Sequence, residues 1–91
     1  MIVRWSHTAL NDLDEIYDYI DFRNPQAALR VKLSIVETGL LLGEFPELGV
    51  VADETNMRRR VIGGLPYILI YRIVGKTIQI VSVVHGKRNF G

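Results

Sequence analysis

The sequence predicts an α+β domain, ordered β-α-α-β-β-β, in which an αα-hairpin packs on one face of an antiparallel sheet. Three features carry this prediction: two successive helical patterns in the first half, three runs rich in β-branched and aromatic residues in the second half, and tight turns between those runs. Adjacent runs joined so closely must be antiparallel neighbours, so the second half predicts a β-meander. At 91 residues, the chain is expected to form one domain, residues 1–91.

The first half predicts a short strand and then two helices. Residues 2–5 alternate as a strand does, and Ser6 can cap the helix that follows, with Thr8 as the competing cap. Apolar residues then recur at steps of three and four, which places them on one helical face. Asn24 and Pro25 cap and open a second apolar helix, which we expect Gly43 to end. The short link predicts a helical hairpin with its apolar side against the sheet.

The second half predicts a turn, a loop and three strands. Residues 45–49 form the turn and residues 50–56 the loop. Gly63-Gly64-Leu65-Pro66 joins the first two strands, and Gly75-Lys76 closes a hairpin between the second and third. The strands are residues 58–62, 67–74 and 77–85. The position of the N-terminal strand in the sheet stays open.

Composition excludes several classes of protein. Hydrophobic residues make up 48% and charged residues 23%, as in a folded globular domain. There is no cysteine, which excludes disulfides and cysteine-ligated metals. No segment approaches the roughly 20 apolar residues that span a bilayer, and the N-terminus runs into a strand instead of a signal peptide. We therefore expect a cytoplasmic protein without membrane association.

Charge is distributed unevenly along the chain although the net charge is only +1. Residues 1–54 hold all ten acidic residues and four basic ones, whereas residues 55–91 hold seven basic residues and no acidic one. This asymmetry indicates an anionic partner for the basic half. The alternative is that acidic helices simply balance a basic sheet within one fold.

The residues that could carry chemistry are arginines and one histidine. No serine lies in a nucleophile turn, no glycine-rich loop opens a helix, and the two histidines lack the carboxylate pattern of a metal site, so we expect no metal and no cofactor. On a strand, Arg58 and Arg60 point to one face and Arg59 to the other. A guanidinium pairs with phosphate or carboxylate oxygens, and His85 can act as an acid or base near neutral pH.

The order and spacing of several short motifs resemble the RelE/ParE toxins of bacterial toxin-antitoxin pairs, closer to the ParE branch, over nearly the whole chain. The motifs are Trp5 with Ala9, Asp12-Leu13, Ile16 and Tyr19-Ile20, then Asn24-Pro25-Gln26-Ala27-Ala28, Phe45-Pro46-Glu47-Leu48-Gly49, Arg58-Arg59, Pro66-Tyr67-Ile68-Leu69-Ile70-Tyr71-Arg72 and Val84-His85-Gly86-Lys87-Arg88.

The resemblance implies a toxin of a type II toxin-antitoxin system that arrests growth unless a cognate ParD-like antitoxin wraps it. ParE-like members are associated with plasmid stabilisation and with poisoning DNA gyrase, and RelE-like members cleave messenger RNA on the ribosome. Operator DNA is then contacted only indirectly, through the antitoxin complex. The alternatives left open are an endoribonuclease and a folded relative without toxicity.

Departures from the RNA-cleaving pattern favour the gyrase branch. Val61 and Ile68 stand where those members carry further basic residues, and the chain ends in Asn89-Phe90-Gly91 without a terminal tyrosine. The catalytic set that the resemblance implies is His85, Arg88 and Arg59. The set expected to bind the target or the antitoxin is Arg58, Arg59, Arg72, Lys87 and Arg88.

Overall fold

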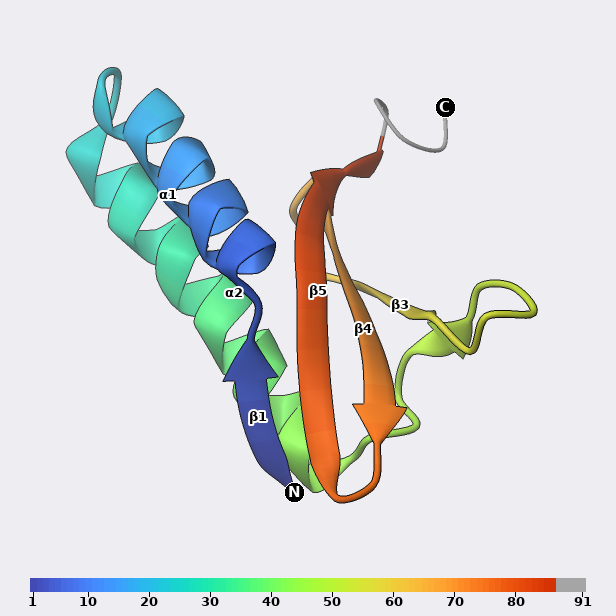
Figure 1. The fold of residues 1–91 in the computed structure, drawn as a ribbon. Helices are drawn as coiled ribbons and strands as arrows, with labels where there is room; N and C mark the ends of the chain where they lie inside the picture. The colour runs from blue at the N-terminus through green and yellow to red at the C-terminus, as the bar shows by residue number, and fades with distance from the viewer. Residues whose placement is uncertain (87–91) are drawn as a thin grey trace.

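The computed structural model describes residues 1–86 and shows a mixed five-stranded sheet with two helices packed against it (Figure 1). Along the chain the elements are β1 (Ile2–Trp5), α1 (His7–Asp21), α2 (Pro25–Glu44), β2 (Val50–Val51), β3 (Arg58–Val61), β4 (Tyr67–Val74) and β5 (Thr77–His85). The α+β class and the order of the predicted elements are confirmed. The short strand β2 lies in a segment that the sequence predicted to be a loop.

The strand order in the sheet is β1-β5-β4-β3-β2. Strands β3, β4 and β5 form the predicted meander. β1 runs parallel to β5, with Ile2 opposite Thr77 and Trp5 opposite Ile80. The sheet is therefore mixed and not wholly antiparallel as predicted. β1 and β5 are separated by most of the chain, so no short link forces them to be antiparallel.

Both helices begin at the caps that the sequence predicts. The Ser6 hydroxyl accepts a hydrogen bond from the Ala9 N–H at 3.0 Å, and the Asn24 side chain accepts one from the Ala27 N–H at 3.1 Å. Each bond satisfies a backbone donor that the first turn of a helix leaves without a partner. Of the two competing caps, Ser6 and Thr8, the structure shows Ser6 at the start of α1.

Two glycines let α2 approach β1 closely. A Cβ on Gly39 would lie 2.8 Å from the Trp5 ring, and one on Gly43 would lie 2.9 Å from Val3. The prediction that Gly43 ends the helix was wrong, because α2 continues through it to Glu44. Gly43 allows α2 to pack closely on β1. The sequence around Gly43 does not indicate this contact.

The helices cover one face of the sheet, and the core lies between the helices and this face. Strand partners share a face, so alternation along β4 and β5 sends one set of side chains into this core. No helix within residues 1–86 covers the other face, which we call the open face. The side chains that are at most 2% exposed are Ala9, Ala28, Ile35, Leu42, Ile62, Leu69, Tyr71, Ile78 and Ile80.

The turn after α2 is tied to the sheet by two side chains. The buried Tyr71 hydroxyl donates to the Pro46 carbonyl and accepts from the Gly49 N–H, both at 2.7 Å. Arg58 donates to the Gly49 carbonyl at 2.8 Å. A Cβ on Gly49 would lie 2.5 Å from the Tyr71 ring, so only glycine fits there. The Phe45-Pro46-Glu47-Leu48-Gly49 motif therefore has a structural role, since its Pro46 and Gly49 backbone groups anchor the turn to the sheet.

Candidate functional site

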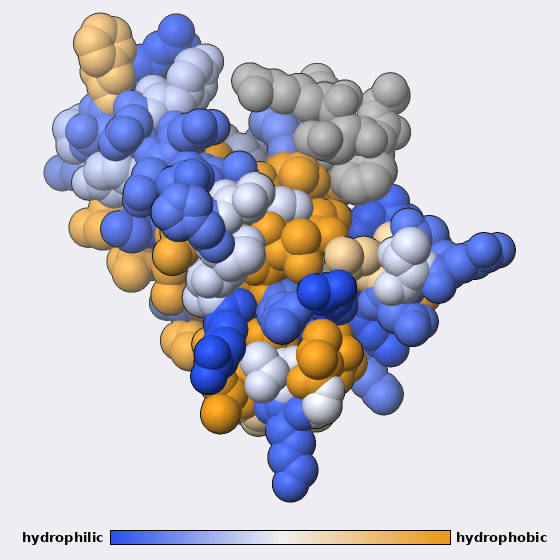
Figure 2. All heavy atoms as spheres, in the orientation of Figure 1, coloured by the Kyte–Doolittle hydropathy of each residue, from blue (hydrophilic) through white to orange (hydrophobic). Residues whose placement is uncertain are grey.

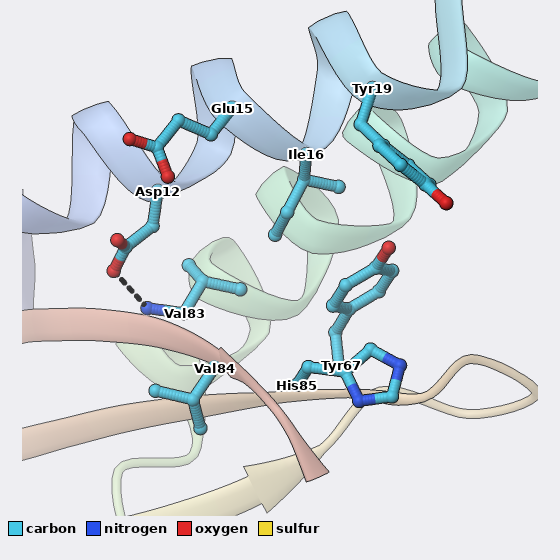
Figure 3. A pocket seen from close by; sticks show the side chains of 8 residues that line it. All are labelled: Asp12, Glu15, Ile16, Tyr19, Tyr67, Val83, Val84 and His85. Carbon is cyan, nitrogen blue, oxygen red and sulfur yellow. Dashed lines mark hydrogen bonds between the residues drawn. The ribbon is translucent and has the colours of Figure 1, made fainter. Parts of the chain in front are cut away.

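A pocket of about 550 Å³ lies between α1 and the ends of β4 and β5 (Figure 3). Asp12 and Glu15 of α1 line one side with their carboxylates, and Tyr67 and His85 line the side formed by the strands. Tyr19 extends from the next turn of α1 toward Tyr67. The pocket therefore combines aromatic walls, an imidazole and two acids.

The geometry of β5 shapes this pocket. The pairing of β4 with β5 shifts between Ile70 and Tyr71, and Val81 is the residue that gains no partner on β4. β1 accompanies β5 only as far as Ile80. Beyond that point side chains take the place of a neighbouring strand: the Ser6 hydroxyl donates to the Val81 carbonyl at 2.7 Å, and the Asp12 carboxylate accepts from the Val83 N–H at 3.0 Å.

His85 is positioned in the pocket by its strand partner. Tyr67 lies opposite His85 in the ladder, and their rings meet edge to face with centroids 5.6 Å apart and planes at 88°. An imidazole here can donate or accept a hydrogen bond within the pocket. Two carboxylates also line the pocket, so the site suits a cationic or neutral group better than a phosphate.

The arginines of β3 divide between the two faces of the sheet. Arg58 is opposite Tyr71 and Arg60 is opposite Leu69, so both lie on the face that carries the helices. Because Arg58 bonds the Gly49 carbonyl, it is a structural residue in addition to being a predicted binding residue. Arg59 is opposite Ile70 and lies on the open face.

The open face combines arginines with apolar side chains. Arg4 and Arg72 stand on either side of Gln79 in one cross-strand row, and the Arg72 Nε donates to the Gln79 side chain at 2.8 Å. None of the five strands places an acidic residue on this face. By the register, the face is formed by Ile2, Arg4, Val50, Arg59, Val61, Ile68, Ile70, Arg72, Val74, Thr77, Gln79, Ser82 and Val84.

Arg59 also influences a turn beside the sheet. The pKa of the exposed Asp53 carboxyl is lowered, chiefly because the Thr55 hydroxyl and the Thr55 N–H donate to it, and the positive charge of Arg59 adds to the effect. The strand pairing places Arg59 on the β2–β3 side of the open face.

The predicted catalytic residues do not come together within the described part of the chain. Arg59 lies on the open face, whereas His85 lies on the helix face beside Tyr67. Lys87 and Arg88, the predicted site residues that follow the last strand, lie outside the described residues. The catalytic set therefore stays a prediction, and Arg59 with Arg72 remains as a pair on one face.

Sequence reasoning missed the roles of Asp12 and Arg4. The acids of α1 were interpreted as a solvated helix face, but Asp12 bonds the backbone of β5 and, with Glu15, lines the pocket. Arg4 joins the open face because β1 lies next to β5. Side chains alternate along residues 2–5, so Arg4 and Trp5 point to different faces of the sheet. The position of Arg4 on the open face was therefore predictable once β1 had been placed next to β5.

Residues 1–86 contain neither a metal-binding cluster nor a membrane-spanning helix. No group of three or more His, Cys, Asp or Glu side chains is arranged to hold a metal ion. No helix in this part of the chain is long and apolar enough to cross a membrane.

Comparison with known families identifies the class of protein. Residues 3–90 match the family described as the ParE toxin of the type II toxin-antitoxin system, parDE. The chain belongs to this family, within the RelE/ParE superfamily of type II toxins.

Relatives of full length support this assignment. The protein Y4kP of Sinorhizobium fredii is 35% identical over 88 residues, which cover 97% of this chain and 91% of that protein. The toxin RelE2 of Caulobacter vibrioides is 35% identical over 86 residues, covering 94% of this chain and 96% of the toxin. One of these relatives thus carries a RelE name, whereas the matching family is that of the ParE toxin.

Solved structures share the fold. A chain of the chromosomal ParDE system of P. aeruginosa superimposes with a TM-score of 0.83 at 28% identity, covering 93% of this chain and 95% of that one. A chain of the RelBE2 toxin-antitoxin complex of Mycobacterium tuberculosis gives a TM-score of 0.70 at 26% identity, covering 92% and 95%. The predicted superfamily is confirmed.

Proposed function

We propose that this toxin arrests growth by binding DNA gyrase, and that a ParD-like antitoxin prevents the arrest by wrapping it. The observation that carries the proposal is the match of residues 3–90 to the ParE family, together with the relation to a ParDE system. An antitoxin partner is also supported by the RelBE2 toxin-antitoxin complex, one chain of which shares this fold.

The arrangement of the site supports binding over RNA cleavage. In-line cleavage of a phosphodiester needs an acid, a base and positive charge next to the reacting phosphate. His85 shares its pocket with the Asp12 and Glu15 carboxylates, which would repel a phosphodiester, and Arg59 lies on the opposite face of the sheet. The carboxylates of the pocket therefore disfavour the approach of a phosphodiester.

The open face is the surface that we propose contacts the target or the antitoxin. It offers Arg4, Arg59 and Arg72 among exposed apolar residues such as Val61, which is 61% exposed. An acidic, partly disordered antitoxin would complement this mixture, since its carboxylates can pair with guanidinium groups while its apolar residues cover the valines. Operator DNA would then be contacted through the antitoxin and not through this chain.

A supercoiling assay with purified gyrase tests the proposal. The pure chain should inhibit supercoiling, and R59E combined with R72E should weaken inhibition about tenfold or more, because each reversal replaces an attraction by a repulsion. R23E is the matched control, since Arg23 lies in the turn between the helices, with its guanidinium 5.4 Å from the centre of the Tyr19 ring. Growth arrest on expression without any effect on gyrase would overturn the proposal.

RNA cleavage is the second candidate function, favoured by the similarity to RelE2 and by the place of His85 in a pocket. Primer extension on translated transcripts discriminates between the two. If cleavage is the activity, cuts appear on expression and H85A abolishes them. A chain whose expression leaves growth unchanged and gyrase active would instead be a relative without toxicity.

A further inference from the structure

Helix α2 carries an apolar stripe on the side that faces away from the core. Leu29, Leu33 and Leu40 are 51%, 49% and 63% exposed, and the half-buried Val36 lies between the second and the third. We call these four residues the α2 seam. Figure 2 shows hydrophobic side chains at intervals along this outer, left-hand edge of the molecule. Burying three exposed leucines would be favourable, so the stripe suits a partner.

The spacing of the seam is that of a helix that packs against another helix. Its members follow one another at intervals of four, three and four residues, which is the a/d pattern of a coiled coil. The buried residues of α2, such as Ile35 and Leu42, lie on a different side and already contact the core. Val36 also packs partly against the core, whereas the three exposed leucines of the seam form an apolar face beyond what the fold of one chain uses.

Charges beside the seam indicate which helix it fits. Arg30 and Glu37 are both exposed, lie on the same flank of the seam, and are seven residues apart. Neither side chain forms a hydrogen bond or an ion pair with another of residues 1–86. On the other flank, Lys32 lies 5.3 Å from the centre of the Tyr17 ring. One flank therefore carries opposite charges at equivalent positions of successive heptads.

An antiparallel copy of α2 satisfies the apolar residues and the charges together. When Leu33 of one chain faces Val36 of a second copy, Leu29 faces Leu40. In the same register, Arg30 lies beside Glu37 of the second copy, and the twofold axis repeats this pair. A parallel pair aligned in register would instead place each charged residue at the same level as its own equivalent.

We propose that two copies of this chain associate through antiparallel packing of their α2 seams, independently of the target of the toxin. A stable interface usually buries about 800 Å² on each partner, more than four side chains of one helix provide. The dimer is therefore weak, and its population depends on protein concentration. The chemistry of the partner is that of the seam itself: leucines in the middle and one pair of opposite charges on each edge.

Sedimentation of the pure full chain over the micromolar to submillimolar range measures this association. We expect the average mass to rise toward that of a dimer, and R30E or E37R alone to weaken association about tenfold because like charges then meet twice. The double variant R30E with E37R should restore it, since the pair is exchanged and not removed. K76E, which changes an exposed cation in the β4–β5 turn, is the control and should have no effect.

A chain that stays monomeric throughout, with its circular dichroism spectrum intact, would overturn the proposal and leave the seam to another partner such as the antitoxin. If the double variant R30E with E37R associates no better than the single variants, the antiparallel register is wrong.

The absence of native cysteine allows a second, geometric test. In the proposed register, position 29 faces position 40 of the second copy, but two copies of position 29 are offset by about 16 Å along the helix axis. A disulfide requires Cα atoms within about 7 Å. A mixture of L29C and L40C chains should therefore cross-link on mild oxidation, and either variant alone should not. Cross-linking of each variant with itself at the same rate would contradict the antiparallel pairing.

Discussion

At the scale of single residues, Tyr71 shows how one side chain joins three parts of the chain. Its ring is fully buried in the core, and its hydroxyl bridges Pro46 and Gly49 in the turn that follows α2. The hydroxyl is bonded to a turn that comes back over the sheet only in the folded protein.

Replacing this tyrosine tests the value of the bridge. Y71F should lower the free energy of unfolding by about 1–3 kcal/mol, because a buried N–H and a carbonyl lose their partner while the ring stays. Denaturant unfolding measures the change. Y17F is the matched control, since the Tyr17 ring that lies near Lys32 is kept and only a hydroxyl is removed. Equal stability of Y71F and wild type would contradict the bridge.

The same variant has a distinct pH dependence. Burial raises the pKa of the Tyr71 phenol above its ordinary value of 10.0. As pH rises through about 10, the unfolded chain therefore loses this proton before the folded chain does, and stability falls with increasing pH. Below that range, the phenol is neutral in both states and contributes no slope. Y71F should lack this part of the alkaline loss of stability.

At the scale of elements, α1 takes the place of a neighbouring strand along the second half of β5, after Ile80. β1 pairs with β5 only as far as Ile80, and side chains from Ser6 and Asp12 then satisfy backbone groups of Val81 and Val83. An edge satisfied in this way is less available for pairing with another chain. The first helix is thus held to the sheet by polar bonds as well as by apolar packing.

Ser6 should therefore matter more than an ordinary cap. S6A removes the cap of α1 and also the donor to the Val81 carbonyl, so we expect a loss of about 2–3 kcal/mol in the free energy of unfolding. N24A removes a cap alone, in an exposed hydrogen bond, and should cost about 1 kcal/mol. Denaturant unfolding of the two variants compares them. If S6A lowers the free energy of unfolding no more than N24A does, the bond from Ser6 to the Val81 carbonyl adds nothing to the cap.

At the scale of the whole molecule, the chain leaves large apolar surfaces uncovered. Apolar residues of the open face and the α2 seam are exposed together in one small domain, although the charges balance to +1. A chain of this size has little stability to spare. Partners that cover these surfaces should therefore change its stability as well as its activity.

The antitoxin complex should melt at a higher temperature than the free toxin. If the antitoxin binds only the folded toxin and is present at 100 to 1,000 times the dissociation constant, linkage predicts a rise of roughly 10–30 °C. Differential scanning calorimetry of toxin, complex, and toxin with an unrelated acidic protein measures this. An unchanged melting temperature in a complex that co-purifies would contradict antitoxin binding at these surfaces.

Local patterns predicted most of the fold. The caps at Ser6 and Asn24, the Gly75-Lys76 hairpin and the meander all depend on neighbours within a few residues, so they were readable from the sequence. The end of α2 and the strand β2 were not. Gly43 could not be distinguished from a helix terminator because its packing partner, Val3, is distant in sequence.

By itself, the sequence determined the α+β class, the superfamily and the basic character of the second half, because local propensity, spacing and composition carry these properties. Only the tertiary structure decided which arginines share a surface. Strand register separates Arg59 from Arg58 and His85 and, through the parallel placement of β1, brings Arg4 into a row with Arg72. That outcome depends on pairing between strands at opposite ends of the chain, which no local pattern records.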